Sequence, residues 1–469
     1  MNLSEEQEHA FQTYLKGYNL FITGPGGTGK SAFIHHIYKH ANINNKRLQV
    51  CAMTGCAAIL LQCRAKTLHS WSGIGLGNGT VEQIIKKISK NSMSVTLWKE
   101  IEVLIVDEVS MLSLKLFDLL NAVGKTIRGN HTKPFGGIQL IFSGDFFQLP
   151  PVGDREDPDT QRFCFESGSW NEVFPNQIVF KHMFRQTDDT FATMLNEIRK
   201  GKIKRKTNDI LLQCVNKPIH KTCKPTKLYP TRSKAEEYNQ TMMSTLVAET
   251  RVYSLRFEEN LEMTKTQQIK RLRFSEKEVQ YEMEYLANNL ICEKETKLKK
   301  GSQVMCIVNT CINGIRGCGG IELCNGSQGI VTGFCEISGL PIVKFDKYGD
   351  VIMKRHIWES EKIPGVGVSH VPLILSWALT IHKSQGMTLE TAEIDAGSGI
   401  FECGQTYVAL SRVKTLEGLF LTSFDPQKIR VHKKVQEYYE FLEQQNNQIK
   451  QNMTVSTSKP KFQEFEYIV

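Results

Sequence analysis

The segment Phe21–Ser31 reads FITGPGGTGKS and contains a complete P-loop, Gly24-x-x-x-x-Gly29-Lys30-Ser31. A short apolar run precedes it, and a run compatible with a helix, SAFIHHIYKHA, follows it. Glycines let backbone N–H groups point at phosphate oxygens, the lysine reaches the β/γ-phosphates, and the Ser hydroxyl ligates Mg²⁺. The following helix adds its positive N-terminal end. A glycine-rich turn that binds nothing is the alternative, which these strand and helix signals disfavour. We therefore predict a nucleoside-triphosphate site built by Gly24, Gly26, Gly27, Thr28, Gly29, Lys30 and Ser31.

The composition describes an ordinary globular protein. The chain has 469 residues, of which 41% are hydrophobic and 23% charged, so we expect two to four domains. No apolar run approaches the length of about 18 residues needed to cross a membrane, and no membrane partner is expected. The N-terminal sequence MNLSEEQEHAF is polar and acidic, unlike a secretory or mitochondrial leader. The net charge of +9 is compatible with a nucleic-acid partner but does not require one.

The thirteen cysteines contain no C-x-x-C pair, and their odd number argues against a closed disulfide framework. This favours a reducing intracellular compartment; nuclear, cytoplasmic and viral settings are not distinguished. Four cysteines form the densest group and could hold zinc or an iron–sulfur cluster. Their irregular spacing and the apolar run around the first favour free thiols instead. They are Cys306, Cys311, Cys318 and Cys324.

Two further apolar runs end in polar residues suited to a nucleotide site. Ile101–Val106 leads into Asp107-Glu108, where one carboxylate can support Mg²⁺ and the other can polarise the attacking water. A surface turn is the alternative. The run 138–143 leads into GDFFQLPP, where Gln148 could sense the γ-phosphate. Strands that alternate with helix patterns predict a parallel α/β sheet with its ligand at the carboxyl ends of the strands.

The second half of the chain holds no second P-loop, but its α/β pattern resumes after a stretch of short strands and turns. We predict a helix that ends in an exposed arginine, Arg412, followed by a strand, LFLTSF. Segment 73–98 is expected to be a polar excursion, and 246–299 shows little pattern. The predicted division is a first domain over 1–175, a second over 176–300 and 372–443, an inserted β module over 301–371, and a flexible tail over 444–469.

The motifs LSEEQEHAF, GPGGTGKS, TGCAA, TLHSW, DEVSM, GDFFQLPPV, FRQ, WALTIHKSQGMTL and GQTYVALSRV occur in this order over about residues 1–430. In this set the chain resembles the petite-integration-frequency (Pif-type) helicases of superfamily one, group B, and their RecD-like relatives. The resemblance implies two RecA-like parallel-sheet P-loop-type domains with an inserted SH3-like β module. It implies an ATP-dependent DNA helicase that moves 5′-to-3′ on single-stranded DNA, with 73–98 as a strand-separating wedge.

The same resemblance implies partners. Single-stranded DNA and duplex/single-strand junctions are the expected substrates, within replication, recombination or repair and with proteins of those processes. The molecule is expected to be a monomer or a weak dimer. The motifs do not distinguish this reading from an RNA or RNA–DNA hybrid helicase, or a nucleoprotein remodeller, on the same motor.

Residue by residue, the resemblance implies that Gln7, in a helix expected over Leu3–Phe11, recognises adenine. It also implies that Ser31 and Asp107 bind Mg²⁺. Glu108 becomes the base and Gln148 the γ-phosphate sensor. Arg185 and Arg412 are implied to be the two arginines that close over the γ-phosphate. Such arginines stabilise the transition state only when the cleft is shut. Gly386 is placed in the nucleotide site. The implied DNA contacts are Thr54, His69, His382, Lys383 and Ser384, with Phe146 or Trp71 as a stacking face or as core.

Overall fold

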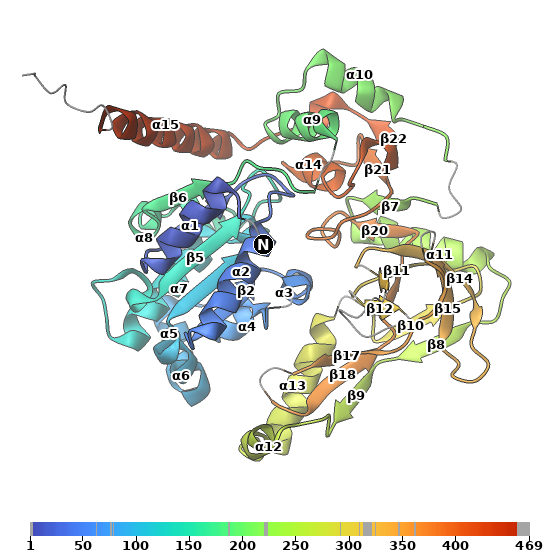
Figure 1. Cartoon of the computed structure of the whole chain (residues 1–469), viewed down its shortest axis with the longest axis horizontal. Helices are drawn as coiled ribbons and strands as arrows, with labels where there is room; N and C mark the ends of the chain where they lie inside the picture. The colour runs from blue at the N-terminus through green and yellow to red at the C-terminus, as the bar shows by residue number, and fades with distance from the viewer. Residues whose placement is uncertain are drawn as a thin grey trace, which may run out of the picture.

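The computed structural model shows two lobes joined by chain that crosses between them more than once (Figure 1). The structure describes residues 3–61, 63–75, 77, 79–185, 188–219, 224–290, 292–308, 310–312, 321–323, 325–345, 348–360 and 363–456. Within these residues, none of the helices is both long and apolar enough to span a bilayer.

The first domain is built on a six-stranded parallel sheet in the order β3-β2-β4-β5-β1-β6. Its central strands are continuous apolar runs because helices cover both faces. The P-loop and the acidic pair follow β1 and β4, which places both at the carboxyl edge of one sheet. The strands are β1 (Leu20–Thr23), β2 (Leu48–Ala52), β3 (Lys66–Thr67), β4 (Val103–Asp107), β5 (Gln139–Gly144) and β6 (Asn176–Val179).

The helices of the first domain are α1 (Glu5–Leu15), α2 (Lys30–Ile43), α3 (Gly55–Leu61), α4 (Leu68–Ser72), α5 (Val81–Ser89), α6 (Ser92–Glu100), α7 (Leu114–Arg128) and α8 (Trp170–Val173). Helix α1 begins at Glu5 after the N-cap residue Ser4, which forms a capping box with Gln7, and it runs on to Leu15, beyond the predicted end at Phe11. The predicted excursion over 73–98 contains α5 and α6. Both helices pack on α7 and on each other, and Trp98 is buried there.

The second domain is a four-stranded parallel sheet in the order β20-β7-β21-β22. Its strands are β7 (Thr226–Tyr229), β20 (Ala378–Thr380), β21 (Ala392–Ala396) and β22 (Leu419–Phe424), the last of which is the predicted strand LFLTSF. Its helices are α9 (Asp189–Arg199), α10 (Arg205–Gln213), α11 (Arg232–Thr245) and α14 (Gln405–Leu410). Two parallel α/β sheets in one chain confirm the predicted fold class.

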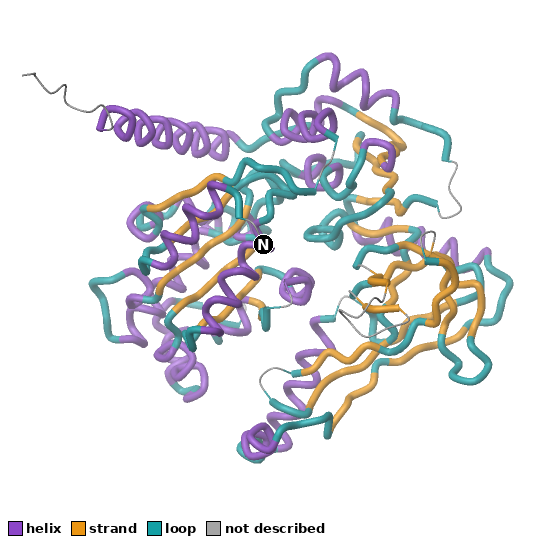
Figure 2. The backbone as a smooth tube through the Cα atoms, in the orientation of Figure 1, coloured by secondary structure: helices purple, strands orange, loops and turns teal. Residues whose placement is uncertain are grey.

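Antiparallel strands fill the stretch between β7 and β20 (Figure 2). They begin at Arg251, upstream of the predicted start at 301, because β9 pairs with β18 and β8 with β10. The strands are β8 (Arg251–Ser254), β9 (Arg256–Glu259), β10 (Glu295–Leu298), β11 (Gln303–Cys306), β12 (Thr310–Ile312), β13 (Ile321–Leu323), β14 (Gln328–Phe334), β15 (Pro341–Phe345), β16 (Gly349–Ile352), β17 (His356–Glu359), β18 (Val366–His370) and β19 (Leu373–Leu375), with helices α12 (Lys265–Arg271) and α13 (Glu276–Asn289).

The cysteine group named above falls mostly on this stretch. Cys318 and Cys324 lie outside the described residues, and the buried Cys306 donates from its Sγ to the carbonyl oxygen of Val308 at 3.3 Å. Among the residues that the structure describes, no cluster of three His, Cys, Asp or Glu side chains could hold a metal ion. Short 3₁₀ turns complete the fold: η1 (Val109–Met111), η2 (Pro134–Gly137), η3 (Pro158–Thr160), η4 (Cys164–Glu166), η5 (Leu416–Gly418) and η6 (Pro426–Lys428).

The first part of helix α15 packs on the first domain rather than on the second. Helix α15 runs from Lys433 to Ser456 and so extends past 444, where the predicted tail begins; residues 457–469 are outside the described residues. Val435, Tyr438, Tyr439 and Leu442 are buried in the same core cluster as the first-domain aromatic residues. These apolar side chains form a stripe at helical spacing on the part of α15 that precedes residue 444, and they hold that part of the helix on the first domain.

Candidate active site

The P-loop connects β1 to α2, and close approaches require its glycines. Gly24, Gly27 and Gly29 have φ angles of 154°, 97° and 79°. A Cβ atom at Gly24 would lie 2.4 Å from the carbonyl oxygen of Phe180, and one at Gly29 would lie 2.8 Å from Nε2 of Gln7. Helix α2 begins at Lys30, so its free N–H groups face the loop. The loop therefore has the shape and the donors of a phosphate cradle.

Lys30 lies over this cradle. Its Nζ donates to the carbonyl oxygens of Gly24 at 2.7 Å and Pro25 at 3.0 Å. Burial lowers the pKa of Lys30, and the carboxylates of Asp145 and Glu108 act in the opposite direction. The ammonium group thus lies in a weakly solvated site, where its attraction to a phosphate is stronger than it would be in water.

The acidic pair lies directly opposite. Asp107 ends β4 and is 5% exposed. Burial, with the charge of Glu108 as the second cause, raises the pKa of Asp107 to about 7. Glu108 has a left-handed backbone, φ 57° and ψ 40°, a costly conformation for a residue with a side chain and one that is concentrated at functional sites. The carboxylate of Asp107 and the hydroxyl of Ser31, an exposed residue in the first turn of α2, are oxygen ligands of the kind that Mg²⁺ prefers.

Gln148 and Gln385 connect this wall to the second domain. Gln385 Nε2 donates to Glu108 Oε2 at 3.0 Å and lies 3.5 Å from Gln148 Oε1. Gln148 is 6% exposed and Gln385 8%. Gly386, the next residue, has a φ of +81°, and a Cβ atom there would lie 3.1 Å from Leu60 of α3. The loop that carries Gln385 and Gly386 therefore contacts the first domain at the acidic pair.

The two predicted arginines lie at the same place. Arg185 Nη1 donates to the carbonyl oxygen of Ser411 at 3.4 Å, and Arg412 Nη2 donates to the Ser411 hydroxyl at 2.9 Å. Burial, and then the neighbouring Arg185, lowers the pKa of Arg412 to about 10. Two guanidinium groups around one serine would be stabilised by an anion between them.

The prediction that Arg412 is exposed is wrong, because it is 2% exposed. The turn that carries it packs onto the P-loop, where a Cβ atom at Gly26 would lie 3.7 Å from Arg412 Nη2. A second hydrogen bond fixes the Arg412 guanidinium, because its Nε donates to the carbonyl oxygen of Val408 at 2.9 Å.

Two aromatic side chains complete the site, and neither was predicted. The hydroxyl of Tyr407 accepts a hydrogen bond from the Gly26 N–H at 2.9 Å. Phe184 is 50% exposed, and its ring lies 3.2 Å from the position of a Cβ atom at Gly29. Their signals were present in the sequence, since Phe184 precedes Arg185 and Tyr407 lies within GQTYVALSRV.

Gln7 lies on the same side of the loop as Phe184. Its Nε2 donates to the carbonyl oxygen of Thr28 at 3.4 Å, and its Oε1 accepts from the N–H of Ser4 at 3.1 Å. The amide therefore lies beside the exposed face of Phe184, where a nucleobase that stacks on the ring would meet it.

The predicted DNA contacts divide into accessible and buried residues. Partly exposed side chains belong to Thr54, His69, His382 and Lys383. Burial lowers the pKa of both histidines, so each is a neutral hydrogen-bonding group near pH 7. Thr54 accepts from the N–H of Ala57 at 3.2 Å and so caps α3, which faces the loop at Gly386. Residues of both domains therefore remain candidates for contact with a DNA strand.

Three of the candidate DNA contacts are buried in this arrangement. Ser384 is 0% exposed, and its hydroxyl donates to the carbonyl oxygen of Ile381 at 2.8 Å. Phe146 is 2% exposed and lies among core rings such as that of Phe165, with the ring centroids 4.8 Å apart. Trp71 is 1% exposed and packs on Trp98. Neither ring offers a face to a base, so the core reading holds for both.

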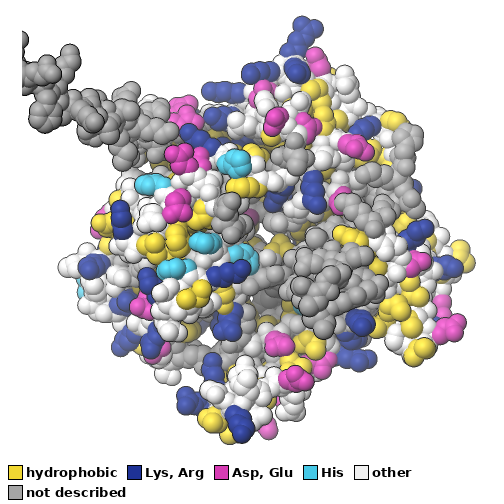
Figure 3. Space-filling view, in the orientation of Figure 1, with side chains coloured by type: hydrophobic (Ala, Val, Ile, Leu, Met, Phe, Trp, Pro, Cys, Tyr) yellow, Lys and Arg dark blue, Asp and Glu magenta, His cyan; other side chains and the backbone are white. Residues whose placement is uncertain are grey.

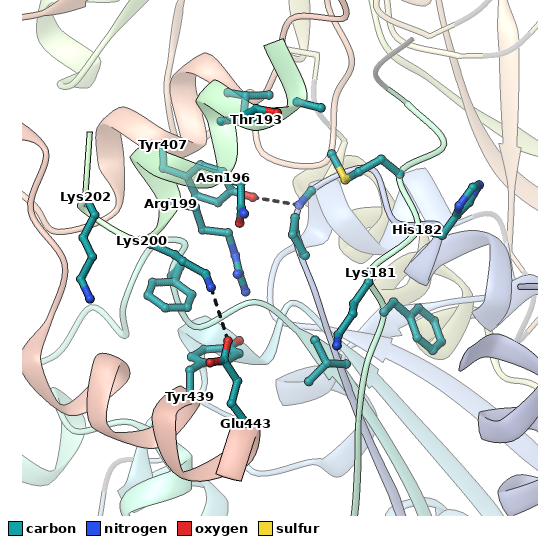
Figure 4. Close-up of a pocket in the computed structure, with 18 of the residues that line it drawn as sticks. Lys181, His182, Thr193, Asn196, Arg199, Lys200, Lys202, Tyr407, Tyr439 and Glu443 are labelled. Carbon is teal, nitrogen blue, oxygen red and sulfur yellow. Dashed lines mark hydrogen bonds and ion pairs between the residues drawn. The ribbon is translucent and has the colours of Figure 1, made fainter. Parts of the chain in front are cut away.

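One cavity lies beside the P-loop, and another lies in the second lobe. The first, of about 940 Å³, lies beside Pro25 and Gly26, and Figure 4 shows Arg199, Tyr407 and Tyr439 pointing into it together. The other, of about 750 Å³, lies between α11, β10 and β20 and includes Lys383. Lys and Arg side chains are spread over both lobes in the space-filling view rather than gathered in one patch (Figure 3).

Known proteins resemble this chain along nearly its whole length. The profile of the PIF1-like helicase family matches residues 2–209. ATP-dependent DNA helicase PIF1 of Emericella nidulans is 35% identical over 505 residues, which cover 95% of this chain and 64% of that protein. ATP-dependent DNA helicase RRM3 of Saccharomyces cerevisiae is 31% identical, with 94% of this chain and 68% of that protein covered. The chain thus spans about two thirds of the length of these relatives.

Solved structures agree in fold. The crystal structure of Pif1 helicase from Candida albicans has a TM-score of 0.71 and 35% identity, covering 94% of this chain and 100% of that one. Pif1 helicase from Bacteroides, crystallised in complex with ADP-AlF3 and ssDNA, has a TM-score of 0.62 and 26% identity, covering 95% and 98%.

Proposed function

Because this chain belongs to the PIF1-like helicase family, we propose that it is an ATP-dependent DNA helicase that translocates on single-stranded DNA and unwinds duplexes. The relatives that it matches carry the name ATP-dependent DNA helicase. The processes that we propose for it are replication, recombination and repair.

One observation carries the proposal. The end of the P-loop where a γ-phosphate would lie is enclosed by residues of both domains. The first domain supplies Lys30, Glu108 and Gln148, and Arg412 approaches from the second, with its Nη2 3.7 Å from the Cβ position of Gly26. Loss of the γ-phosphate would remove the anion that the opposing groups share. Nucleotide state is thereby coupled to the separation of the domains, which is what a translocating motor requires.

In this proposal Ser31 and Asp107 would hold Mg²⁺, which would neutralise charge at the phosphates. Glu108 accepts the proton of the attacking water, and Arg185 and Arg412 stabilise the negative charge that develops. Gln7 and Phe184 hold the base, and Gly386 keeps its loop, with Gln385, close against α3.

The DNA path that we propose runs between the domains, along Thr54 and His69 on one side and His382 and Lys383 on the other. Hydroxyls, neutral imidazoles and an ammonium group are all donors to phosphate oxygens. Movement 5′-to-3′ and a strand-separating role for α5 and α6 rest on family membership.

ATP turnover measured with and without single-stranded DNA tests this function. We expect strong stimulation by DNA, loss of turnover in Lys30→Ala, and in His382→Ala weakened DNA stimulation with basal turnover retained. DNA binding should weaken steeply as salt rises, because phosphate contacts release counterions. A wild-type ATPase that is indifferent to single-stranded DNA would contradict the proposal, and stimulation by RNA alone would redirect it to the RNA helicases.

A further inference from the structure

Arg199 and Asp145 form a buried ion pair that has no part in the roles assigned above. Arg199 is 5% exposed and Asp145 0%. The guanidinium donates two hydrogen bonds to the carboxylate, from Nε at 2.9 Å and from Nη2 at 2.8 Å. Arg199 ends α9, whose apolar side chains belong to the core of the second domain. Asp145 directly follows β5 of the first domain. The pair therefore joins the two domains through a bidentate contact.

Tyr439 of α15 completes the network from a third direction. Its ring stacks on Phe147 with the centroids 4.5 Å apart, and the Arg199 guanidinium lies 4.3 Å from the centre of the Phe147 ring. The Tyr439 hydroxyl donates to Asp145 Oδ1 at 3.3 Å and accepts from the Phe146 N–H at 3.2 Å. It also shares a hydrogen bond of 2.5 Å with the hydroxyl of Thr23. Figure 4 shows the side chain of Arg199 extending towards Tyr439 in the cavity beside Gly26.

The residues held by this network carry the predicted γ-phosphate sensor. Phe147 belongs to the first-domain core, whereas Leu149, two residues later, belongs to the second-domain core. Gln148 lies between them, and its N–H donates to the carbonyl oxygen of Asp145 at 2.9 Å. A Cβ atom at Gly404 would lie 2.6 Å from the Gln148 carbonyl oxygen. The backbone at Gln148 is therefore confined between the domains, with Asp145 as its nearest anchor.

We propose that Arg199 and Tyr439 are positioning residues for Gln148. Because Arg199 moves with the second domain and Asp145 with the first, their ion pair transmits the relative position of the domains to the backbone of the sensor. The Tyr439 hydroxyl fixes Asp145 and Phe146 from the side of the first domain. The inference rests on the proposed ATP hydrolysis and adds to it two residues that lie outside the sequence motifs.

Tyr439→Phe tests the proposal, because it removes one hydroxyl and keeps the ring. Tyr438→Phe is the matched control: it removes the same atom from the adjacent residue, whose hydroxyl bonds Trp170 Nε1 at 3.1 Å and Gln177 Oε1 at 2.5 Å, away from Asp145. The readouts are kcat and KM for ATP with saturating oligothymidylate. We expect Tyr439→Phe to lower kcat about fivefold with KM within twofold, and Tyr438→Phe to leave both within twofold.

A second comparison separates positioning from general stability. If Tyr439 acts through Gln148, adding Tyr439→Phe to Gln148→Ala changes kcat less than twofold. Equal kcat values for Tyr439→Phe and Tyr438→Phe, or additive losses in the Gln148→Ala background, overturn the inference. If circular dichroism shows that the Tyr439→Phe protein is unfolded, Arg199→Lys takes its place in the test. This substitution keeps the charge but loses the bidentate fork. An inactive wild-type protein contradicts the proposed function itself.

Discussion

Replacement of Arg199 by leucine should be among the most destabilising single changes in this chain. The substitution keeps much of the apolar volume but leaves the Asp145 carboxylate, 0% exposed, without its guanidinium partner. Removal of one member of a buried pair costs about 3–5 kcal/mol, because an uncompensated charge stays in a poorly solvated site. The lost contact of the guanidinium with the Phe147 ring acts in the same direction.

The assay is thermal unfolding followed by tryptophan fluorescence, to which Trp170 in the same core contributes. For a domain of this size, each kcal/mol lowers Tm by about 2–4 °C, so Arg199→Leu should lower Tm by roughly 6–20 °C. Arg199→Leu combined with Asp145→Asn removes the buried charge and should recover at least half of the loss. A drop of less than about 2 °C, or no recovery in the double variant, would refute the reasoning.

The remaining predictions concern the nucleotide site. Glu108→Gln should lower kcat by about 10²–10⁴-fold with ATP still bound, because an amide cannot accept the proton; rapid-quench turnover measures this. Phe184→Ala should raise KM for ATP about fivefold or more while kcat changes little, since base–aromatic stacking contributes roughly 1–3 kcal/mol; steady-state titrations check it. The raised pKa of Asp107, about 7, means that its carboxyl is protonated at low pH, so apparent Mg²⁺ affinity, measured by activity titration, should rise up to about tenfold per unit as pH increases towards 7. Metal-free stability should change in the opposite sense, falling as pH rises from about 4 through about 7.

The parts of the site that sequence predicts well are those whose chemistry is local. The P-loop, Asp107 and Glu108 each follow an apolar run directly, and parallel strands bring their carboxyl ends to one edge of a sheet. The structure accordingly places Lys30 and the acidic pair together: the charges of both carboxylates act on the pKa of Lys30, and Lys30 acts on that of Asp107. For roles that depend on the resemblance, such as that of Arg412, the sequence identifies the residue but does not predict how deeply its side chain is buried.

The parts that sequence reasoning missed depend on packing between distant segments. Arg199 and Asp145 are 54 residues apart, and neither shows a pattern that marks the other. Tyr439 lies 294 residues from Asp145, on a helix whose far end reads as a polar tail. The burial of Ser384 and Phe146 was missed for the same reason. Their exposure depends on residues that are distant in the sequence, which a local sequence pattern does not identify. Hydroxyl and aromatic residues in a DNA-facing motif are for that reason poor indicators of direct contact.

Strand separation tests the central claim most directly. A DNA duplex with a 5′ single-stranded tail, a second with a 3′ tail and a blunt one are mixed with the protein, ATP and Mg²⁺, and the released strand is quantified. We expect strand release from the 5′-tailed duplex, little release from the other two, and no release by the Lys30→Ala protein. Release without ATP, or no release from any tailed duplex by a protein that hydrolyses ATP, would contradict the claim that domain closure over the P-loop drives movement along DNA.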